Sequence, residues 1–177
     1  MDKTIGIFGG GQLGRMMAQA ALPLNIQCTF FEASTDCPSS ALGQVFSTKA
    51  ENGLADFIQS ADVFSLEFEN TPLEDVDVLT KNKDIHPPRQ ALAIAQHRLS
   101  EKALFDELDI PVAPYNAVDS LESLKQAVTD LGLPIVLKTA TGGYDGKGQF
   151  VLRSEDQIDQ AWAELGPAGS LIAESFV

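Results

Sequence analysis

The sequence has 177 residues, with 25 aspartates and glutamates against 12 lysines and arginines, so its formal charge is −13 at pH 7. This charge disfavours nucleic acids and anionic membrane surfaces as partners. A hydrophobic content of 44% excludes disordered and collagen-like chains, and no apolar run approaches the ~20 residues of a membrane span. No signal peptide is visible. The two cysteines, Cys28 and Cys37, lack zinc or redox spacing, so we expect both to be reduced and structural.

The first part of the chain alternates between strand and helix patterns. Apolar runs at Thr4–Phe8, Ile26–Phe31 and Val63–Phe68 predict strands. A helix after the first strand carries an apolar stripe that we expect to pack on a sheet, formed by Leu13, Met16, Met17, Ala20 and Leu24. Further helices are expected around Leu54–Ser60 and after Pro72. The alternation predicts a mostly parallel sheet with helices on both faces.

The pattern changes at Ile85–Pro88, because two consecutive prolines fit neither a helix nor a central strand. We therefore place a domain boundary after residue 92. Beyond the prolines we expect helices at Arg89–Leu108, which crosses into the second domain, 93–177, and at Ser120–Leu131, strands at Pro134–Lys138 and Gln149–Leu152, and a helix opened by a Ser154/Gln157 capping box. A strand-like run, Leu171–Val177, closes the sequence, and we expect this domain to be truncated there.

A glycine turn follows the first predicted strand. Gly9–Gly14 fits G-x-G-x-x-G between a strand and a helix, which is the context of a phosphate-binding turn. Glu32 ends the next strand, where dinucleotide-binding proteins keep the carboxylate that contacts a ribose. We favour an anion site here over the alternative that the glycines only allow close packing of the strand on the helix.

The string Glu67-Phe68-Glu69-Asn70 lies at the carboxyl end of a predicted strand, the edge where open α/β sheets bind ligands. Alternation along the strand would put both glutamates on one face and Phe68 in the core. The alternative is a solvated strand end. The pattern leaves open whether Glu67 or Glu69 faces a ligand.

The loop from Thr141 to Gln149 holds four glycines within seven residues, more than a hairpin needs. It is not a Walker A loop, because Gly148 rather than Ser or Thr follows Lys147 and no helix comes next. With Lys138 on the preceding strand and Lys147 in the loop, the sequence predicts a lid over a polyphosphate, with a mobile exposed loop as the alternative.

The remaining polar residues carry weaker signals. Arg98 taken alone has the pattern of a surface arginine. His86 and His97 have no partner at metal or triad spacing, and no arrangement suggests nucleophilic catalysis.

In combination, these strings resemble the 5-(carboxyamino)imidazole ribonucleotide synthetase family, the ATP-grasp ligases of bacterial and fungal purine biosynthesis. The resemblance spans about Ile5 to Val177 and is carried by GGGQLGRM, EFEN-x-P, H-R-L-x-E-K and, after Lys138, GGYDGKGQ. It implies an α/β fold with a Rossmann-like parallel-sheet pre-ATP-grasp domain, here 1–92. The first part of an ATP-grasp α+β domain would follow, here 93–177.

The resemblance also implies roles for individual residues. Lys138, Tyr144 and Asp145 are implied to be catalytic. The implied ATP contacts are Arg98, Lys138, Gly143, Tyr144, Asp145, Gly146, Lys147, Gly148, Gln149, Glu174, Ser175, Phe176 and Val177. Lys138 would neutralise the α- and β-phosphates, and Glu174 and Val177 would lie at the adenine hinge. The implied contacts of 5-aminoimidazole ribonucleotide are Gly11, Gln12, Leu13, Glu67, Tyr144 and Asp145.

In the implied reaction, ATP phosphorylates bicarbonate to carboxyphosphate, and the amine of 5-aminoimidazole ribonucleotide captures the carboxyl group on the route to IMP. Magnesium is implied as a cofactor, with its ligands beyond Val177 and none within this chain. We expect a cytoplasmic enzyme that is a homodimer at full length, takes only these small molecules as partners, and is inactive as the 177-residue chain alone.

Two other interpretations remain open at this point. A nicotinamide-dinucleotide-binding module would use Gly9–Gly14 and Glu32, but it leaves Lys138 and the glycine-rich loop without a role. A non-catalytic nucleotide-binding fragment is the other. Paired acidic residues near an asparagine downstream of Val177 would favour the ligase.

Overall fold

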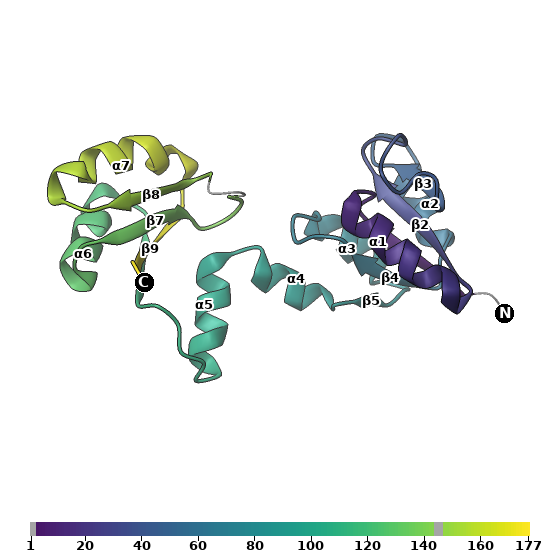
Figure 1. The fold of residues 1–177 in the computed structure, drawn as a ribbon, viewed down its shortest axis with the longest axis horizontal. Coiled ribbons are helices and arrows are strands. Elements are labelled where there is room, and N and C mark those ends of the chain that lie inside the picture. The colour runs from purple at the N-terminus through teal and green to yellow at the C-terminus, as the bar shows by residue number, and fades with distance from the viewer. Residues whose placement is uncertain (1–2, 144–146) are drawn as a thin grey trace. The chain divides into compact units, whose positions relative to one another are not determined.

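The computed structural model describes residues 3–143 and 147–177, and the chain divides into two compact units, Met1–Ala93 and Ile94–Val177. Figure 1 shows both units, each built of strands with helices packed beside them. Tyr144, Asp145 and Gly146, three of the predicted site residues, lie outside the described residues.

The first unit is a five-stranded parallel sheet in the order β3-β2-β1-β4-β5. Its strands are β1 (Lys3–Phe8), β2 (Ile26–Glu32), β3 (Gln44–Ser47), β4 (Val63–Leu66) and β5 (Ile85–His86). Its helices are α1 (Gln12–Ala21), the 3-10 turn η1 (Leu22–Leu24), α2 (Gly53–Gln59) and α3 (Leu73–Leu79). The predicted parallel sheet is confirmed. The short strand β5 lies at the sheet edge, where the following prolines cost no internal ladder bonds.

Two apolar cores lie on opposite faces of this sheet. On one face α1 packs against Ile7 and Phe30 through Ala18 and Ala21. On the other face, α2 and α3 cover phenylalanine rings of the strands, and the ring of Phe57 on α2 stacks on that of Phe31 on β2 at 5.2 Å between centroids. Helices therefore cover both faces, as the alternating sequence pattern predicted.

The predicted apolar stripe of α1 does not coincide with the face of the helix that is buried in the structure. Met16 is 61% exposed and Leu13 is 45% exposed, whereas the buried positions of the helix are Gly14, Ala18 and Ala21. Small side chains let the helix approach the sheet closely, and of the predicted stripe Met17 packs against this core while Leu13, Met16 and Leu24 are exposed. Hydrophobicity alone favoured a shifted face because the buried positions of the helix are alanine and glycine, with Met17 at their margin.

The second unit is a four-stranded antiparallel sheet in the order β6-β9-β7-β8. Its strands are β6 (Tyr115–Val118), β7 (Ile135–Thr139), β8 (Gln149–Leu152) and β9 (Leu171–Ser175). Helices α6 (Leu121–Leu131) and α7 (Ile158–Leu165), with the 3-10 turns η2 (Glu155–Gln157) and η3 (Gly166–Ala168), lie together on one side of it (Figure 1). The α+β character predicted for this part is confirmed.

The predicted helical stretch Arg89–Leu108 is two helices, α4 (Arg89–Ala95) and α5 (Arg98–Glu107). The break falls at His97, which is extended and forms an isolated β-bridge with Thr141. The backbone N–H of Arg98 donates to the carbonyl of Ala140 at 2.8 Å. The pairing with the loop after β7 thus ends the helical pattern.

Helix α6 begins with a capping box, in which Ser120 Oγ accepts the backbone N–H of Ser123 at 3.1 Å and Ser123 Oγ accepts that of Ser120 at 3.0 Å. The capping box predicted at Ser154 is wrong, because Ser154 makes no side-chain cap bond. Gln157 Oε1 accepts the backbone N–H of Arg153 instead, at 2.8 Å.

Both cysteines are free, as expected, with Cys28 buried. None of the helices formed by the described residues is long and apolar enough to cross a membrane.

Candidate functional site

Three acidic and glycine-rich segments meet at the carboxyl edge of the first sheet. The chain runs from β1 through β2 to β3 on one side of β1 and then crosses back to β4 on its other side, so the strand order reverses at β1. The glycine turn follows β1, Glu32 ends β2 and Glu67 follows β4. In open α/β sheets this switch point is where ligands bind.

Glu67 holds the amino end of α1. Its Oε2 accepts the backbone N–H of Gly11 at 2.8 Å, and its Oε1 accepts that of Leu13 at 3.1 Å. Unpaired N–H groups and the helix dipole favour a negative charge at this end of a helix. The predicted anion site is therefore occupied by a carboxylate of the chain itself.

Glu32 takes a second N–H of the turn. Its Oε2 accepts the backbone N–H of Gly10 at 3.0 Å, while its Oε1 accepts that of Ala33 at 2.7 Å. The N–H groups of Gly10 and Gly11, which a dinucleotide-binding protein would offer to a pyrophosphate, are thus both bonded to side chains of this unit.

The contact with Glu67 explains why two of these positions are glycine. A Cβ on Gly11 would lie 2.4 Å from Glu67 Oε1, and a Cβ on Gly9 would lie 2.5 Å from Glu67 Oε2. Gly9 also has a φ of 105°, which L residues rarely adopt. In this structure the glycines therefore allow the turn to approach the Glu67 carboxylate closely.

The structure brings Gly11, Leu13 and Glu67 together, with Gln12 exposed beside them. Phe68 is exposed, so its predicted place in the core was wrong. The alternation argument failed because β4 ends at Leu66, before the acidic string begins.

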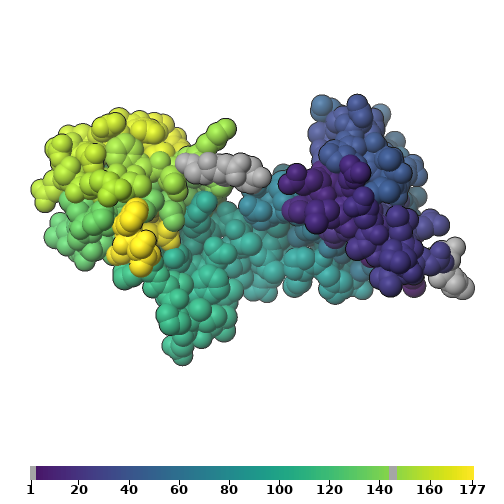
Figure 2. Space-filling model, viewed as in Figure 1, coloured from purple at the N-terminus to yellow at the C-terminus, as the bar shows by residue number. Residues whose placement is uncertain are grey.

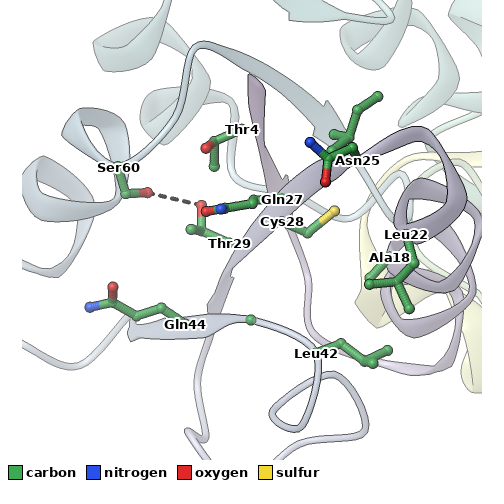
Figure 3. A pocket seen from close by; sticks show the side chains of 12 residues that line it. Thr4, Ala18, Leu22, Asn25, Gln27, Cys28, Thr29, Leu42, Gln44 and Ser60 are labelled. Carbon is green, nitrogen blue, oxygen red and sulfur yellow. Dashed lines mark hydrogen bonds between the residues drawn. The ribbon is translucent and has the colours of Figure 1, made fainter. Parts of the chain in front are cut away.

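A cavity of about 490 Å³ lies at the opposite, amino edge of the same sheet (Figure 3). It is lined by uncharged residues, including Gln27, Cys28 and Thr29, and the Thr29 hydroxyl is 2.9 Å from that of Ser60. Burial raises the pKa of the Cys28 thiol. With no charged side chain in its lining, this cavity lacks the groups that phosphate recognition requires.

The second unit gathers charged residues on the face of its sheet that points away from α6 and α7. Val136 pairs with Glu174, and Lys138 pairs with Ile172. Lys138 and Glu174 therefore share one face, while Leu137 and Ala173 point into the core on the other.

Glu174 is 7% exposed and lies between two lysines. Lys102 Nζ on α5 is 2.7 Å from Glu174 Oε1, and Lys138 Nζ pairs with Oε2 of the same carboxylate. We call these three residues the Glu174 cluster. Burial acts to raise the pKa of Glu174, but hydrogen bonds and charges from both lysines outweigh it and hold the pKa below its usual value.

Arg98 holds the base of the glycine-rich loop. Its Nη1 donates to the carbonyls of Thr139 at 2.8 Å and Gly142 at 2.7 Å, and its Nη2 donates to that of Gly143 at 3.4 Å. A guanidinium carries five N–H groups in a fixed plane, so donors remain beyond these three bonds. The arginine that taken alone resembled a surface residue is a clamp on the loop.

The described parts of the loop place the other predicted residues as follows. Lys147 is exposed, and Gln149 opposes Lys138 on β8. Positive φ angles at Gly142, Gly143 and Gly148 account for these three glycines by backbone conformation alone.

The last residues of the chain follow β9. Ser175 donates its backbone N–H to the carbonyl of Pro114 at 2.9 Å. The Phe176 ring is 5.5 Å from the guanidinium of Arg153, and Val177 is fully exposed. Figure 2 shows this end of the chain, in yellow, at the surface of the second unit.

Sequence reasoning missed Lys102 as a member of the site. The available signal was its spacing of four residues from Arg98, which puts both cations on one side of α5. In the described residues no group of three or more His, Cys, Asp or Glu side chains could hold a metal ion.

Comparison with known proteins assigns the family. Residues 1–96 match the family model of the ribonucleotide synthetase preATP-grasp domain, and residues 103–177 match that of the ATP-grasp domain. The chain belongs to the ribonucleotide synthetase preATP-grasp family. The preATP-grasp match covers the first sheet and its glycine turn, and the ATP-grasp match covers the second half of α5 and the whole second sheet.

Relatives of this preATP-grasp chain include the N5-carboxyaminoimidazole ribonucleotide synthase of Pseudomonas aeruginosa, which is 40% identical over 98% of this chain and 48% of the relative. Among solved structures, N5-carboxyaminoimidazole synthetase from Staphylococcus aureus complexed with ADP has a TM-score of 0.92 at 33% identity, covering 99% of this chain and 48% of that one. The Aspergillus clavatus N5-carboxyaminoimidazole synthase in complex with ADP and 5-aminoimidazole ribonucleotide has a TM-score of 0.87 at 26% identity, covering 99% and 47%. These relatives confirm the resemblance expected from the sequence, and the chain spans about half their length.

Proposed function

We propose that this chain supplies the preATP-grasp domain and the first part of the ATP-grasp domain of an ATP-dependent ligase. The ligase would carboxylate 5-aminoimidazole ribonucleotide with bicarbonate in purine biosynthesis. The observation that carries the proposal is the Glu174 cluster beside a glycine-rich loop clamped by Arg98, in a chain whose relatives bear the names given above. One relative was solved with ADP and 5-aminoimidazole ribonucleotide.

On the nucleotide side, Lys138 is the proposed phosphate ligand. Its ammonium pairs with Glu174 at the end of β7, where the chain enters the glycine-rich loop. A phosphate group would compete for this ammonium, and charge neutralisation is the main protein contribution to phosphoryl transfer. The loop residues, from Gly143 to Gln149, would close on the phosphates with their backbone N–H groups. Glu174 to Val177 would contact the adenine.

On the ribonucleotide side, the proposed contacts are Gly11, Gln12, Leu13 and Glu67. Each carboxylate oxygen of Glu67 accepts one backbone N–H and has a further lone pair. That acceptor suits an amine or a hydroxyl rather than a phosphate, because like charges repel. Tyr144 and Asp145 would complete this side. The ribonucleotide phosphate would then find its cations outside the glycine turn.

Magnesium would accompany ATP, with ligands outside the described residues, since these contain no suitable acidic cluster. A cytoplasmic location and a homodimer at full length belong to the same proposal. The rival nicotinamide interpretation is disfavoured by the side-chain carboxylates that occupy the N–H groups of Gly10 and Gly11. We accordingly expect no measurable affinity for nicotinamide dinucleotides.

The test is a carboxylation assay on the full-length protein that contains this chain. With ATP, ¹³C-bicarbonate and 5-aminoimidazole ribonucleotide, the product should gain one labelled carboxyl group for each ATP consumed, as mass spectrometry and ADP release would report. Leaving out the ribonucleotide should abolish formation of the labelled product. ATP consumption without any labelled product in the complete mixture would overturn the proposal.

A further inference from the structure

We propose that Lys102 is a positioning residue of the nucleotide site, a fixed counter-cation that keeps Glu174 ionised and in place when Lys138 moves to a phosphate. The inference rests on the proposed function for its consequence in nucleotide binding. Its structural basis is the arrangement of one buried carboxylate between two ammonium groups.

The two lysines pair with different oxygens of the Glu174 carboxylate. Lys102 pairs with Oε1 of Glu174 and Lys138 with Oε2, so each oxygen has its own cation. With two ammonium groups and one carboxylate, the cluster therefore has a net charge of +1. One ammonium can leave for another anion, and Glu174 still keeps a partner.

The surroundings make Lys102 the fixed member of the pair. Its side chain is 17% exposed, against 30% for Lys138, and its Nζ lies 5.9 Å from the centroid of the Tyr115 ring. Tyr115 pairs with Glu174 across β6 and β9, and its hydroxyl donates to Asp106 on α5 at 2.7 Å. The ring thus links the strand that faces Glu174 to the helix that carries Lys102.

Lys138, in contrast, stands at the entrance to the loop. The next residue, Thr139, ends β7 and accepts a bond from Arg98 on its carbonyl. An anion held by that loop would lie within the reach of a lysine side chain placed at its base. Lys138 is therefore the cation that can be exchanged, and Lys102 the one that stays.

The consequence follows from the cost of an unpaired buried charge. If Lys138 were the sole partner of Glu174, its transfer to a phosphate would leave a nearly buried carboxylate without a cation, and this penalty would be subtracted from nucleotide affinity. With Lys102 in place the carboxylate remains paired in both states. Lys102 would then strengthen nucleotide binding without touching the nucleotide.

The first arm of the test does not depend on nucleotide binding. In the full-length protein with ¹³C-carboxyl-labelled glutamate, the Glu174 signal is assigned by its loss in Glu174→Gln and followed through a pH titration. In Lys138→Met, which imitates the departure of the exchangeable cation, Glu174 should still titrate at or below its ordinary pKa of 4.5. In Lys102→Met/Lys138→Met it should titrate about one pH unit or more higher, because burial then acts without either lysine. Equal pKa values in the two variants would overturn the proposal.

The second arm measures MgATP affinity by calorimetry. Lys102→Met should weaken binding about tenfold, and Lys102→Arg should stay within about threefold of the wild type, because it keeps the charge. Lys125→Met, which removes an exposed lysine of α6, is the matched control and should change nothing. In a Glu174→Gln background, Lys102→Met should have no further effect.

A tenfold loss that persists in the Glu174→Gln background would mean that Lys102 acts directly on the nucleotide or through packing, and would overturn the proposal. If the parent protein does not bind ATP at all, the proposed function fails. The titration arm would still decide whether Lys102 holds Glu174.

Discussion

Gly11 and Glu67 depend on each other in the structure. Gly11 has an ordinary extended backbone, with φ −77° and ψ −157°, so its lack of a side chain is required only by the carboxylate beside it. Gly11 and Glu67, which is 56 residues later in the sequence, therefore together form the cap at the amino end of α1.

This dependence predicts a specific coupling. Gly11→Ala should lower the free energy of unfolding by about 1–3 kcal/mol, because the new methyl group would displace the Glu67 carboxylate from the N–H groups of Gly11 and Leu13. In a Glu67→Ala background, where the carboxylate is gone, the same substitution should cost less than about 0.5 kcal/mol. Urea unfolding followed by circular dichroism measures both values. An equal cost in the two backgrounds would show that the glycine serves something other than the approach of Glu67.

Glu174 predicts a pH dependence of stability. Its pKa is held below 4.5 in the folded state although burial opposes this, since the bonds and charges of Lys102 and Lys138 outweigh desolvation. A carboxyl group whose pKa is lowered by folding stabilises the fold above its unfolded pKa, and this contribution is lost as pH falls through the folded value. The stability advantage of wild type over Glu174→Gln should therefore be complete at pH 7 and shrink below about pH 4.5. An advantage that stays constant from pH 7 to pH 3 in urea titrations would contradict the ion-pair account.

At the scale of elements, two serine-initiated helices of the second unit differ in how they begin. Ser120 makes both bonds of a capping box with Ser123, whereas Ser154 makes no cap bond and the turn is closed by Gln157 on the N–H of Arg153. Ser120→Ala should cost about 1 kcal/mol of unfolding free energy. Ser154→Ala, the matched control, should cost no more than about 0.3 kcal/mol. Similar losses for both in urea unfolding would mean that Ser154 caps its helix in solution.

The sequence predicted helices and strands correctly where apolar residues recur with a clear period. It failed where tertiary packing or pairing with a distant segment determines the structure. The strands at the centre of the first sheet are continuous apolar runs, so the sequence predicted that they are buried. The inner face of helix α1 was assigned only in part, because Ala18 and Ala21 are its buried positions, Met17 packs beside them and Met16 is exposed. The break between α4 and α5 depends on the bridge from His97 to Thr141, a contact that no local pattern contains.

The site could be predicted only in part for the same reason. Composition and position in the sequence were enough to single out the glycine turn, Glu67, Lys138 and the glycine-rich loop. Lys102 does not, because its importance comes from the burial of Glu174 beside it, a property of the folded sheet and helix together. The identity of the anion in the glycine turn also required the structure, since a phosphate and a nearby carboxylate demand the same glycines.

At the scale of the whole molecule, the two units carry separate groups of candidate site residues. The first unit offers the acceptor Glu67 at the switch point of a parallel sheet, and the second offers cations at the base of a glycine-rich loop. This division agrees with an enzyme of two substrates, one of them a nucleotide. We propose that the charged face of the second sheet binds ATP through Lys138.

The most direct test of that claim is the MgATP affinity of the full-length protein with Lys138→Met, beside Lys125→Met as the exposed control. Charged hydrogen bonds contribute about 1.5–3 kcal/mol each, so the loss of the Lys138 ammonium should weaken ATP binding about 10- to 100-fold. The control should bind within about twofold of wild type. If Lys138→Met binds MgATP as tightly as the control does, the charged face of the second sheet is not the nucleotide site.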